Sequence, residues 1–213
     1  MNAQTRRAQI AGPAGEVECA IDEPAAAPVG VAVVCHPHPL FGGTLDNKVV
    51  QTVARAFVQQ GLRCVRFNFR GIGRSQGQWD EGRGEVDDAL AVVAAHRDAA
   101  LPLVLAGFSF GGYVAASAAA RLADDAKAAR LVLIAPATQN FPTPIVPPDT
   151  LVVHGELDDV VPLQATLDWA RPQTLPVVVV PGGGHFFHGQ LPLLKDIVLR
   201  AGAQRGLTPT TPR

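Results

Sequence analysis

Short, continuous runs of apolar and mostly β-branched residues constrain the fold of this chain more than any other feature of its sequence. They occur at residues 29–35, 103–106, 131–135, 151–153 and 177–180. Unbroken apolar character is typical of strands that are buried on both faces, as in the interior of a parallel sheet. Residues 64–69 also have strand character, but Arg66 and Asn68 interrupt the run, so we expect one face there to be less buried. A weaker alternating stretch at 16–21 predicts an antiparallel edge strand.

Helical patterns separate these runs. Apolar residues recur at spacings of three and four, which places them on one helical face. The predicted helices lie around residues 49–57, 86–93, 113–122, 164–170 and 191–199. Strands and helices in alternation imply right-handed crossovers. The fold class is therefore α/β, a doubly wound and mostly parallel sheet with helices on both faces.

The length of the chain fits one domain. With 213 residues, of which 47% are hydrophobic and 17% charged, the chain can build a sizeable core. We expect residues 1–15 to form a flexible N-terminus, residues 16–204 a single domain, and residues 205–213 a flexible tail.

Charge and cysteine content indicate which partners and which redox environment this protein is expected to have. The formal net charge is −1 with no block of like charge, which favours neither a nucleic-acid nor a membrane partner. Cys19, Cys35 and Cys64 are odd in number and widely spaced, so we expect reduced thiols. No apolar stretch follows Arg6 and Arg7, so we expect no signal peptide and a cytoplasmic protein, monomeric or homodimeric.

The sharpest motif in the chain is Gly107-Phe108-Ser109-Phe110-Gly111, between a predicted buried strand and an alanine-rich helix. A serine on such a strand-to-helix turn is lifted clear of the sheet, and glycines on both sides allow close backbone approach. The alternative is an N-cap serine between flexible glycines. The flanking glycines and the residues downstream favour a nucleophile.

A serine nucleophile needs a base, and the base needs an orienting acid. The loop after the predicted strand at 151–153 offers Glu156, Asp158 and Asp159 as acids. The glycine-rich loop after the last strand offers His185, with His188 close by. The carboxyl ends of parallel strands meet at one edge of a sheet, where ligands bind in this class of fold.

Together these motifs resemble the α/β-hydrolase superfamily, in particular its small, capless bacterial members related to dienelactone hydrolases and acyl-peptidase catalytic domains. Three further matches to that superfamily are Arg70-Gly71-Ile72-Gly73-Arg74-Ser75-Gln76-Gly77, Asp158 before Val161-Pro162, and His185-Phe186-Phe187. The resemblance selects Asp158 over Asp159 and His185 over His188. Dienelactone hydrolases carry cysteine where Ser109 stands, so their lactone specificity is not transferred.

The oxyanion formed at the carbonyl needs two backbone N–H donors. One comes from the residue after the nucleophile, Phe110. The early loop 36–43 supplies the other, and because Pro37 and Pro39 have no N–H, His38 or Leu40 remains. The similarity of His36-Pro37-His38 to the His-Gly-x loops of the superfamily favours the His38 amide. For the substrate pocket, the sequence suggests the apolar side chains near these motifs, namely Leu40, Phe41, Phe108 and Phe186.

These residues predict a carboxylesterase-like serine hydrolase that acts on small-molecule acyl esters through an acyl-enzyme. No cofactor and no metal are expected, since H-E-x-x-H is absent and no third ligand accompanies His185 and His188. Residues 136–150 are too short and too rich in proline to hold a lid domain, so short or polar acyl groups are expected. A peptidase or thioesterase with the same triad is the alternative, followed by a non-catalytic binding protein on the same fold.

Overall fold

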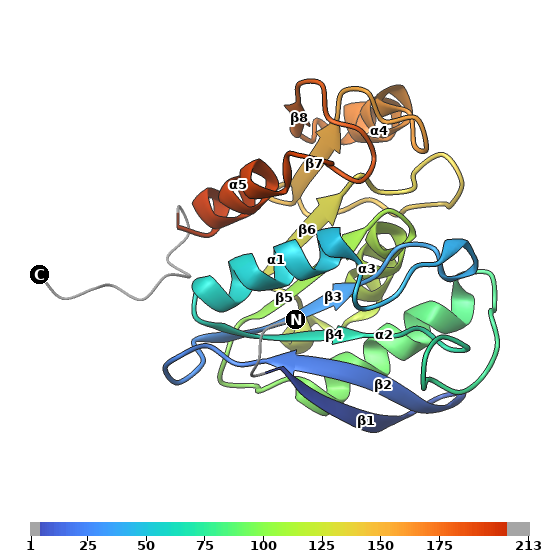
Figure 1. The fold of residues 1–213 in the computed structure, drawn as a ribbon, viewed down its shortest axis with the longest axis vertical. Helices are drawn as coiled ribbons and strands as arrows, with labels where there is room; N and C mark the ends of the chain where they lie inside the picture. Colours follow the sequence, from blue (N-terminus) through green and yellow to red (C-terminus); the bar gives the residue numbers. More distant parts are fainter. Residues whose placement is uncertain (1–4, 204–213) are drawn as a thin grey trace, which may run out of the picture.

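A computed structural model describes residues 5–203 as one eight-stranded sheet between two layers of helices (Figure 1). The strands are β1 (Arg6–Gly12), β2 (Gly15–Asp22), β3 (Gly30–Cys35), β4 (Leu62–Phe67), β5 (Leu103–Phe108), β6 (Arg130–Ile134), β7 (Leu151–Gly155) and β8 (Val177–Val180). Their order across the sheet is β1-β2-β4-β3-β5-β6-β7-β8. β1 and β2 are antiparallel to their neighbours, and the others run parallel. The predicted fold class is confirmed.

The helices cover both faces of the sheet. They are α1 (Lys48–Gln59), α2 (Arg83–His96), α3 (Phe110–Arg121), α4 (Leu163–Ala170) and α5 (Leu191–Ala203). α1 and α5 lie together over one face, whereas α2 and α3 lie together over the other (Figure 1). The central strands β3, β5 and β6 are buried throughout, which is why their sequences are apolar without alternation.

The chain changes direction across the sheet at β3. The crossover from β3 through α1 leads to β4 on one side, and the next crossover through α2 leads to β5 on the other. Helices on either side of such a point leave a crevice at the carboxyl ends of the strands. The loop after β3 and the turn after β5 both open into this crevice, which places residues 36–43 beside Ser109.

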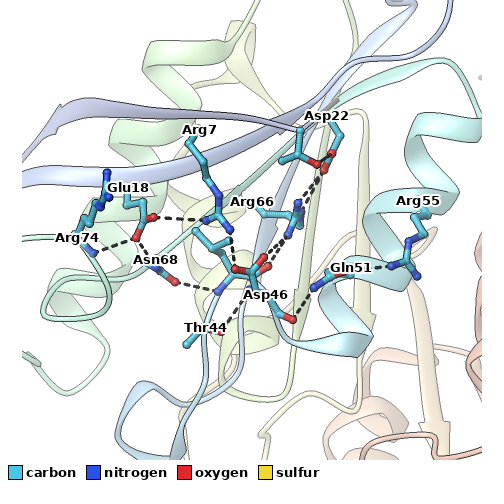
Figure 2. A network of polar contacts seen from close by, with 12 residues as sticks. Arg7, Glu18, Asp22, Thr44, Asp46, Gln51, Arg55, Arg66, Asn68 and Arg74 are labelled. Carbon is cyan, nitrogen blue, oxygen red and sulfur yellow. Dashed lines mark hydrogen bonds and ion pairs between the residues drawn. The ribbon is translucent and has the colours of Figure 1, made fainter. Parts of the chain in front are cut away.

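A network of charged and polar side chains joins β1, β2 and β4 to the segment before α1 (Figure 2). The guanidinium of Arg66 lies between the carboxylates of Asp22 and Asp46, at 3.0 and 3.2 Å. Arg66 is 2% exposed and Asn68 is 4% exposed. The expectation that these two residues leave one face of the strand less buried is therefore wrong. Their partners come from distant parts of the sequence. The Arg66–Asp22 pair is enclosed, whereas the side chain of Asp46 is 41% exposed.

The N-terminal prediction also needs correction. Residues 6–12, expected to be part of a flexible N-terminus, form β1, which pairs with β2 from Arg6 opposite Ile21 to Gly12 opposite Gly15. Ala8 and Ile10 pack against the core from this edge strand, which explains its order. The predicted tail at 205–213 lies outside the described residues. Within residues 5–203, no helix is long and apolar enough to cross a membrane.

Candidate active site

Ser109 occupies the tight turn between β5 and α3. Its backbone has φ 56° and ψ −120°, a conformation that L residues with a side chain rarely adopt. A Cβ on Gly107 would lie 1.9 Å from the Gly111 carbonyl oxygen, and one on Gly111 would lie 2.3 Å from the Cys35 carbonyl oxygen. Only glycine fits at these two positions, so the flanking glycines let the strained turn pack against the end of β3. This is the arrangement that the motif predicts.

The loops after β7 and β8 bring Asp158 and His185 together. His185 Nδ1 lies 2.7 Å from Asp158 Oδ2, and both residues are buried. The competing acids Glu156 and Asp159 are exposed, as is His188. Of the acids and histidines that the sequence left open, the structure pairs the two that the superfamily resemblance selected.

Every oxygen of the Asp158 carboxylate is occupied. Oδ1 accepts the N–H groups of Val160 and Val161 at 3.0 and 2.8 Å. Oδ2 faces His185, and it also lies 3.3 Å from Nε2 of His154, a buried residue of β7. Burial alone would raise the pKa of Asp158, but the hydrogen bonds from His154, His185 and Val161 outweigh it and hold this pKa well below its usual range. The carboxylate is thus charged and fixed.

His154 is a part of this arrangement that the sequence did not single out. Its Nε2 lies 2.8 Å from the Val161 carbonyl oxygen as well as near Asp158. Both neighbours are acceptors, so Nε2 carries the proton and donates to them. The spacing of four residues between His154 and Asp158, across the end of a strand, was the available signal.

Ser109 and His185 line the same cavity, of about 340 Å³. No hydrogen bond joins them within the part of the chain that the structure describes, and catalytic hydrogen bonds commonly tighten only when substrate binds. Because Asp158 engages Nδ1 of His185, Nε2 is the ring nitrogen left to face Ser109. Ser109 is 7% exposed and His185 is 3% exposed, so little water surrounds the pair.

Of the two residues whose amides are predicted for the oxyanion, His38 lines this cavity and Phe110 directly follows Ser109, which also lines it. Phe110 opens α3, and the first N–H groups of a helix have no acceptor within it. His38 lines the cavity, and its N–H donates to no other residue in the described range 5–203. The N–H of Leu40, the other candidate, lies 3.3 Å from His38 Nδ1 and donates to it.

Two of the four residues predicted for the substrate pocket line this cavity. Phe41 and Phe186 line the cavity, whereas Leu40 and Phe108 do not. Leu40 points to solvent from the short helical turn at Pro39–Phe41 and is 63% exposed. Phe108 is buried at the end of β5, where its ring lies 4.9 Å from the His185 ring. The sequence missed the other residues of the wall, which are Pro37, Gly42, Gly43, Asn47 and Val160.

Comparison with known proteins places this site in a family. Residues 28–149 match the family described as serine aminopeptidase S33. An α/β serine hydrolase without a lid from Xanthomonas campestris is 37% identical, with a TM-score of 0.88 over 100% of this chain and 99% of that one. An α/β serine hydrolase homologue from Coxiella burnetii is 40% identical, with a TM-score of 0.83 over 92% of this chain and 96% of that one.

A third relative is an uncharacterized protein of Rickettsia prowazekii, 39% identical over 107 residues. The match covers 49% of this chain and spans 45% of the length of that relative. Like the Xanthomonas protein, this chain has no lid within residues 5–203, because neither helix nor strand lies between β6 and β7. The chain belongs to the serine aminopeptidase S33 family of the α/β-hydrolase superfamily, and it shares the fold of the lid-free serine hydrolase that it resembles.

Proposed function

We propose that this protein is a carboxylesterase that cleaves short acyl esters with Ser109 as nucleophile, His185 as base and Asp158 as orienting acid. The observation that carries the proposal is the 2.7 Å contact between His185 and Asp158, next to a strained serine in one cavity. A serine hydroxyl is unreactive without a base held in the correct tautomer, and Asp158 is a charged acceptor for that purpose.

The reaction proceeds in two halves. His185 Nε2 accepts the hydroxyl proton while Ser109 Oγ attacks the ester carbonyl carbon, and the N–H groups of Phe110 and His38 bind the oxyanion. Collapse of the intermediate breaks the bond to the alcohol, which leaves with the proton from His185. Water then repeats the steps on the acyl-enzyme and releases the carboxylic acid. None of these steps needs a cofactor.

The cavity supports an ester substrate with a small apolar portion. Phe41, Val160 and Phe186 supply apolar walls that are themselves exposed, at 86%, 53% and 42%. A cavity of about 340 Å³ lies at the small end of the range for ligand sites. With no lid to open, we expect activity on dissolved esters without activation by a lipid emulsion.

The family description favours a second candidate, an aminopeptidase. Such an enzyme must bind the free ammonium group of its substrate, which calls for a carboxylate close to the nucleophile. The residues that line the cavity within the described chain include no Asp or Glu. This lining favours esters over peptides with a free N-terminus.

The test is Ser109→Ala with Ser117→Ala, a serine within the helix α3 that follows Ser109, as the matched control. We expect Ser109→Ala to abolish both ester turnover and covalent labelling by a fluorophosphonate, and Ser117→Ala to retain both. A panel of p-nitrophenyl esters, acyl-thioesters and aminoacyl p-nitroanilides then ranks the substrate classes. Full turnover by Ser109→Ala would overturn the proposal, and the highest kcat/KM on the anilides would favour the peptidase.

A further inference from the structure

His36 is a buried side chain that the proposed chemistry does not use. It follows β3, is 0% exposed, and both of its ring nitrogens are engaged. The Phe69 N–H lies 3.0 Å from Nε2, and the Pro37 carbonyl oxygen lies 2.6 Å from Nδ1. A backbone N–H can only donate, so Nε2 must accept and the ring proton must sit on Nδ1. His36 therefore donates to the Pro37 carbonyl.

The neutral ring is stable in this place. Burial lowers the pKa of His36 to about 3, so the ring stays uncharged at neutral pH and keeps its acceptor nitrogen. Its ring packs against the ring of Phe69 in a tilted arrangement, with 4.4 Å between the centroids and 51° between the ring planes. The His36 ring therefore contacts Phe69, just after the end of β4, and is shielded from solvent.

The Pro37 carbonyl and the His38 N–H belong to the same peptide unit. This unit is trans, as are all described peptide bonds, so its C=O and N–H point in opposite directions from one rigid plane. A hydrogen bond that fixes the carbonyl oxygen therefore also fixes the direction of the N–H. The His38 N–H is the second oxyanion donor in the proposed mechanism.

We propose that His36 is a positioning residue for the oxyanion hole: by donating Nδ1–H to the Pro37 carbonyl, it aims the His38 N–H at the substrate carbonyl. The inference rests on the proposed esterase function and adds a residue to it. His36 does not touch substrate, and it acts only through the peptide plane between Pro37 and His38.

Gly43 holds the same carbonyl from another side. A Cβ on Gly43 would lie 2.0 Å from the Pro37 oxygen and 2.6 Å from the His38 oxygen, so the backbone of residue 43 packs directly on this peptide. The Gly43 N–H also donates to the His38 oxygen at 3.0 Å. Two contacts therefore restrict the peptide between Pro37 and His38. One is the hydrogen bond from the His36 side chain, and the other is the close packing of the Gly43 backbone, which a side chain at residue 43 would prevent.

The far end of the same loop is tied to β4 as well. Asn68 Oδ1 accepts the Leu45 N–H at 2.9 Å, and Arg66 Nη1 donates to the Leu45 carbonyl at 2.8 Å. Figure 2 shows both side chains reaching the segment around Asp46. Phe69 bonds His36 at the start of the loop, and Arg66 and Asn68 bond Leu45 beyond its end. Three residues at or just after the end of β4 therefore hold the loop at both of its ends. This support makes a preorganised amide possible.

Two substitutions separate the two hydrogen bonds of His36. His36→Asn carries an amide near the position of Nδ1 and keeps a donor for the Pro37 carbonyl. His36→Gln carries its amide near the position of Nε2 and keeps only the contact with Phe69. The readouts are kcat and KM for p-nitrophenyl acetate, and the inhibition constant of a trifluoromethyl ketone, whose adduct with Ser109 bears an oxyanion.

We expect His36→Gln to lower kcat by about 10- to 100-fold, since removal of a whole oxyanion donor lowers it by about 10²–10³. Affinity for the trifluoromethyl ketone should fall in parallel, while KM changes by less than about threefold. His36→Asn should stay within about fivefold of the wild-type kcat. Val53→Ala, a cavity in the core under α1, is the control for lost stability alone and should leave kcat unchanged.

Gly43→Ala is the second way to move the same peptide, with His36 intact. Its methyl group must displace the Pro37 oxygen, so we expect the same fall in kcat and in ketone affinity. Equal kcat for His36→Gln and wild type, or equal losses for His36→Gln and His36→Asn, would overturn the inference. If the His36 variants do not fold, an unchanged kcat in Gly43→Ala overturns it instead. A wild-type protein that no fluorophosphonate labels refutes the esterase itself, which is a different result.

Discussion

The two sides of the cavity are built in different ways. The base arm, residues 155–162 and 181–188, contributes side chains that bond one another, with His185 on Asp158. The oxyanion arm, residues 36–43, would contribute the His38 N–H in the proposed mechanism, and the side chains of His36 and His38 bond backbone groups of this loop. Chemistry that resides in side chains is visible in the residue types of a sequence. A backbone N–H group, in contrast, is positioned by buried neighbouring side chains, and no sequence motif identifies those neighbours.

The residues that hold the two arms in place also differ, because those of the base arm are near in sequence and those of the oxyanion arm are distant. The base arm is held locally, by Val160, Val161 and His154 around one carboxylate. The oxyanion arm is followed by Leu45, whose carbonyl accepts from Arg66 of β4, and Arg66 in turn pairs with Asp22 near the antiparallel edge of the sheet. We therefore expect damage to the base arm to stop catalysis in a folded protein, and damage behind the oxyanion arm to reduce stability as well.

The largest expected effect is on the base arm, in Asp158→Asn. An amide no longer holds the His185 ring in the tautomer that leaves Nε2 free to accept a proton, and the same change in the triad of a serine protease lowers kcat by about 10⁴. Asp159→Asn, an exposed neighbour, is the matched control and should change kcat by less than about twofold. Steady-state kinetics with thermal melts measures both. Equal losses in the two variants would mean that Asp158 has no special role.

The next effect is expected behind the oxyanion arm, in Arg66→Met. Removing Arg66, which is 2% exposed, strands the buried Asp22 carboxylate, and breaking a buried pair lowers the free energy of unfolding by about 3–5 kcal/mol. Arg63→Met on the same strand breaks a pair whose side chains are 37% and 44% exposed, which contributes at most about 1 kcal/mol. Urea unfolding compares the variants. A difference below about 1 kcal/mol between them would refute the view that this arm depends on a buried charge.

The sequence predicted those parts of the fold and site that follow from local patterns. Continuous apolar runs marked the buried parallel strands, and the glycines around Ser109 marked the turn because a Cβ has no room there. Asp158 and His185 followed from their positions after late strands, together with a family resemblance. Each of these signals lies within a few residues of the feature it predicts.

What the sequence left out depends on partners that are distant along the chain. Arg66 reads as an interruption of a strand until Asp22, on β2, is placed beside it. Strand β1 has few apolar residues, and its pairing with β2 brings Ala8 and Ile10 against the core. Phe108 was assigned to the pocket because it precedes Ser109, yet it is buried at the end of β5, where its ring packs against the ring of His185. His36 acquires a role only when its two hydrogen bonds are seen.

The third expected effect is a loss of folding stability at acidic pH, which begins at a higher pH for His36 on the oxyanion arm than for Asp158 on the base arm. The pKa of His36 is about 3 in the folded protein and near 6.5 when unfolded, so between these values the unfolded chain binds the extra proton. The stability that the neutral ring provides is complete above about pH 6.5 and is lost as pH falls toward about 3. Asp158 acts in the same direction only at lower pH, because its stabilisation is lost below its usual pKa of about 4.

His36→Asn cannot take up that proton. Between about pH 6.5 and about pH 4.5, we expect the wild type to lose about 2–3 kcal/mol more unfolding free energy than this variant does. Burial also lowers the pKa of His38 and His96, and both remain in the variant as a common background. Urea titrations at the two pH values measure the difference. Parallel losses in both proteins would contradict the assignment of acid sensitivity to His36.

The smallest expected effect asks which arm holds the substrate. Phe41 on the oxyanion arm is 86% exposed and lines the cavity, whereas its neighbour Leu40 is 63% exposed and does not. Phe41→Ala should therefore raise KM for p-nitrophenyl butyrate by about fivefold, or about 1 kcal/mol of apolar contact, and Leu40→Ala should not. Phe186 on the base arm also lies 5.0 Å from the His185 ring, so Phe186→Ala should lower kcat in addition to raising KM. If Phe41→Ala lowers kcat as Phe186→Ala does, then both arms orient the reacting groups through their aromatic rings. In that case the oxyanion arm also acts through a side chain, and the contrast between the two arms does not hold at the rim of the cavity.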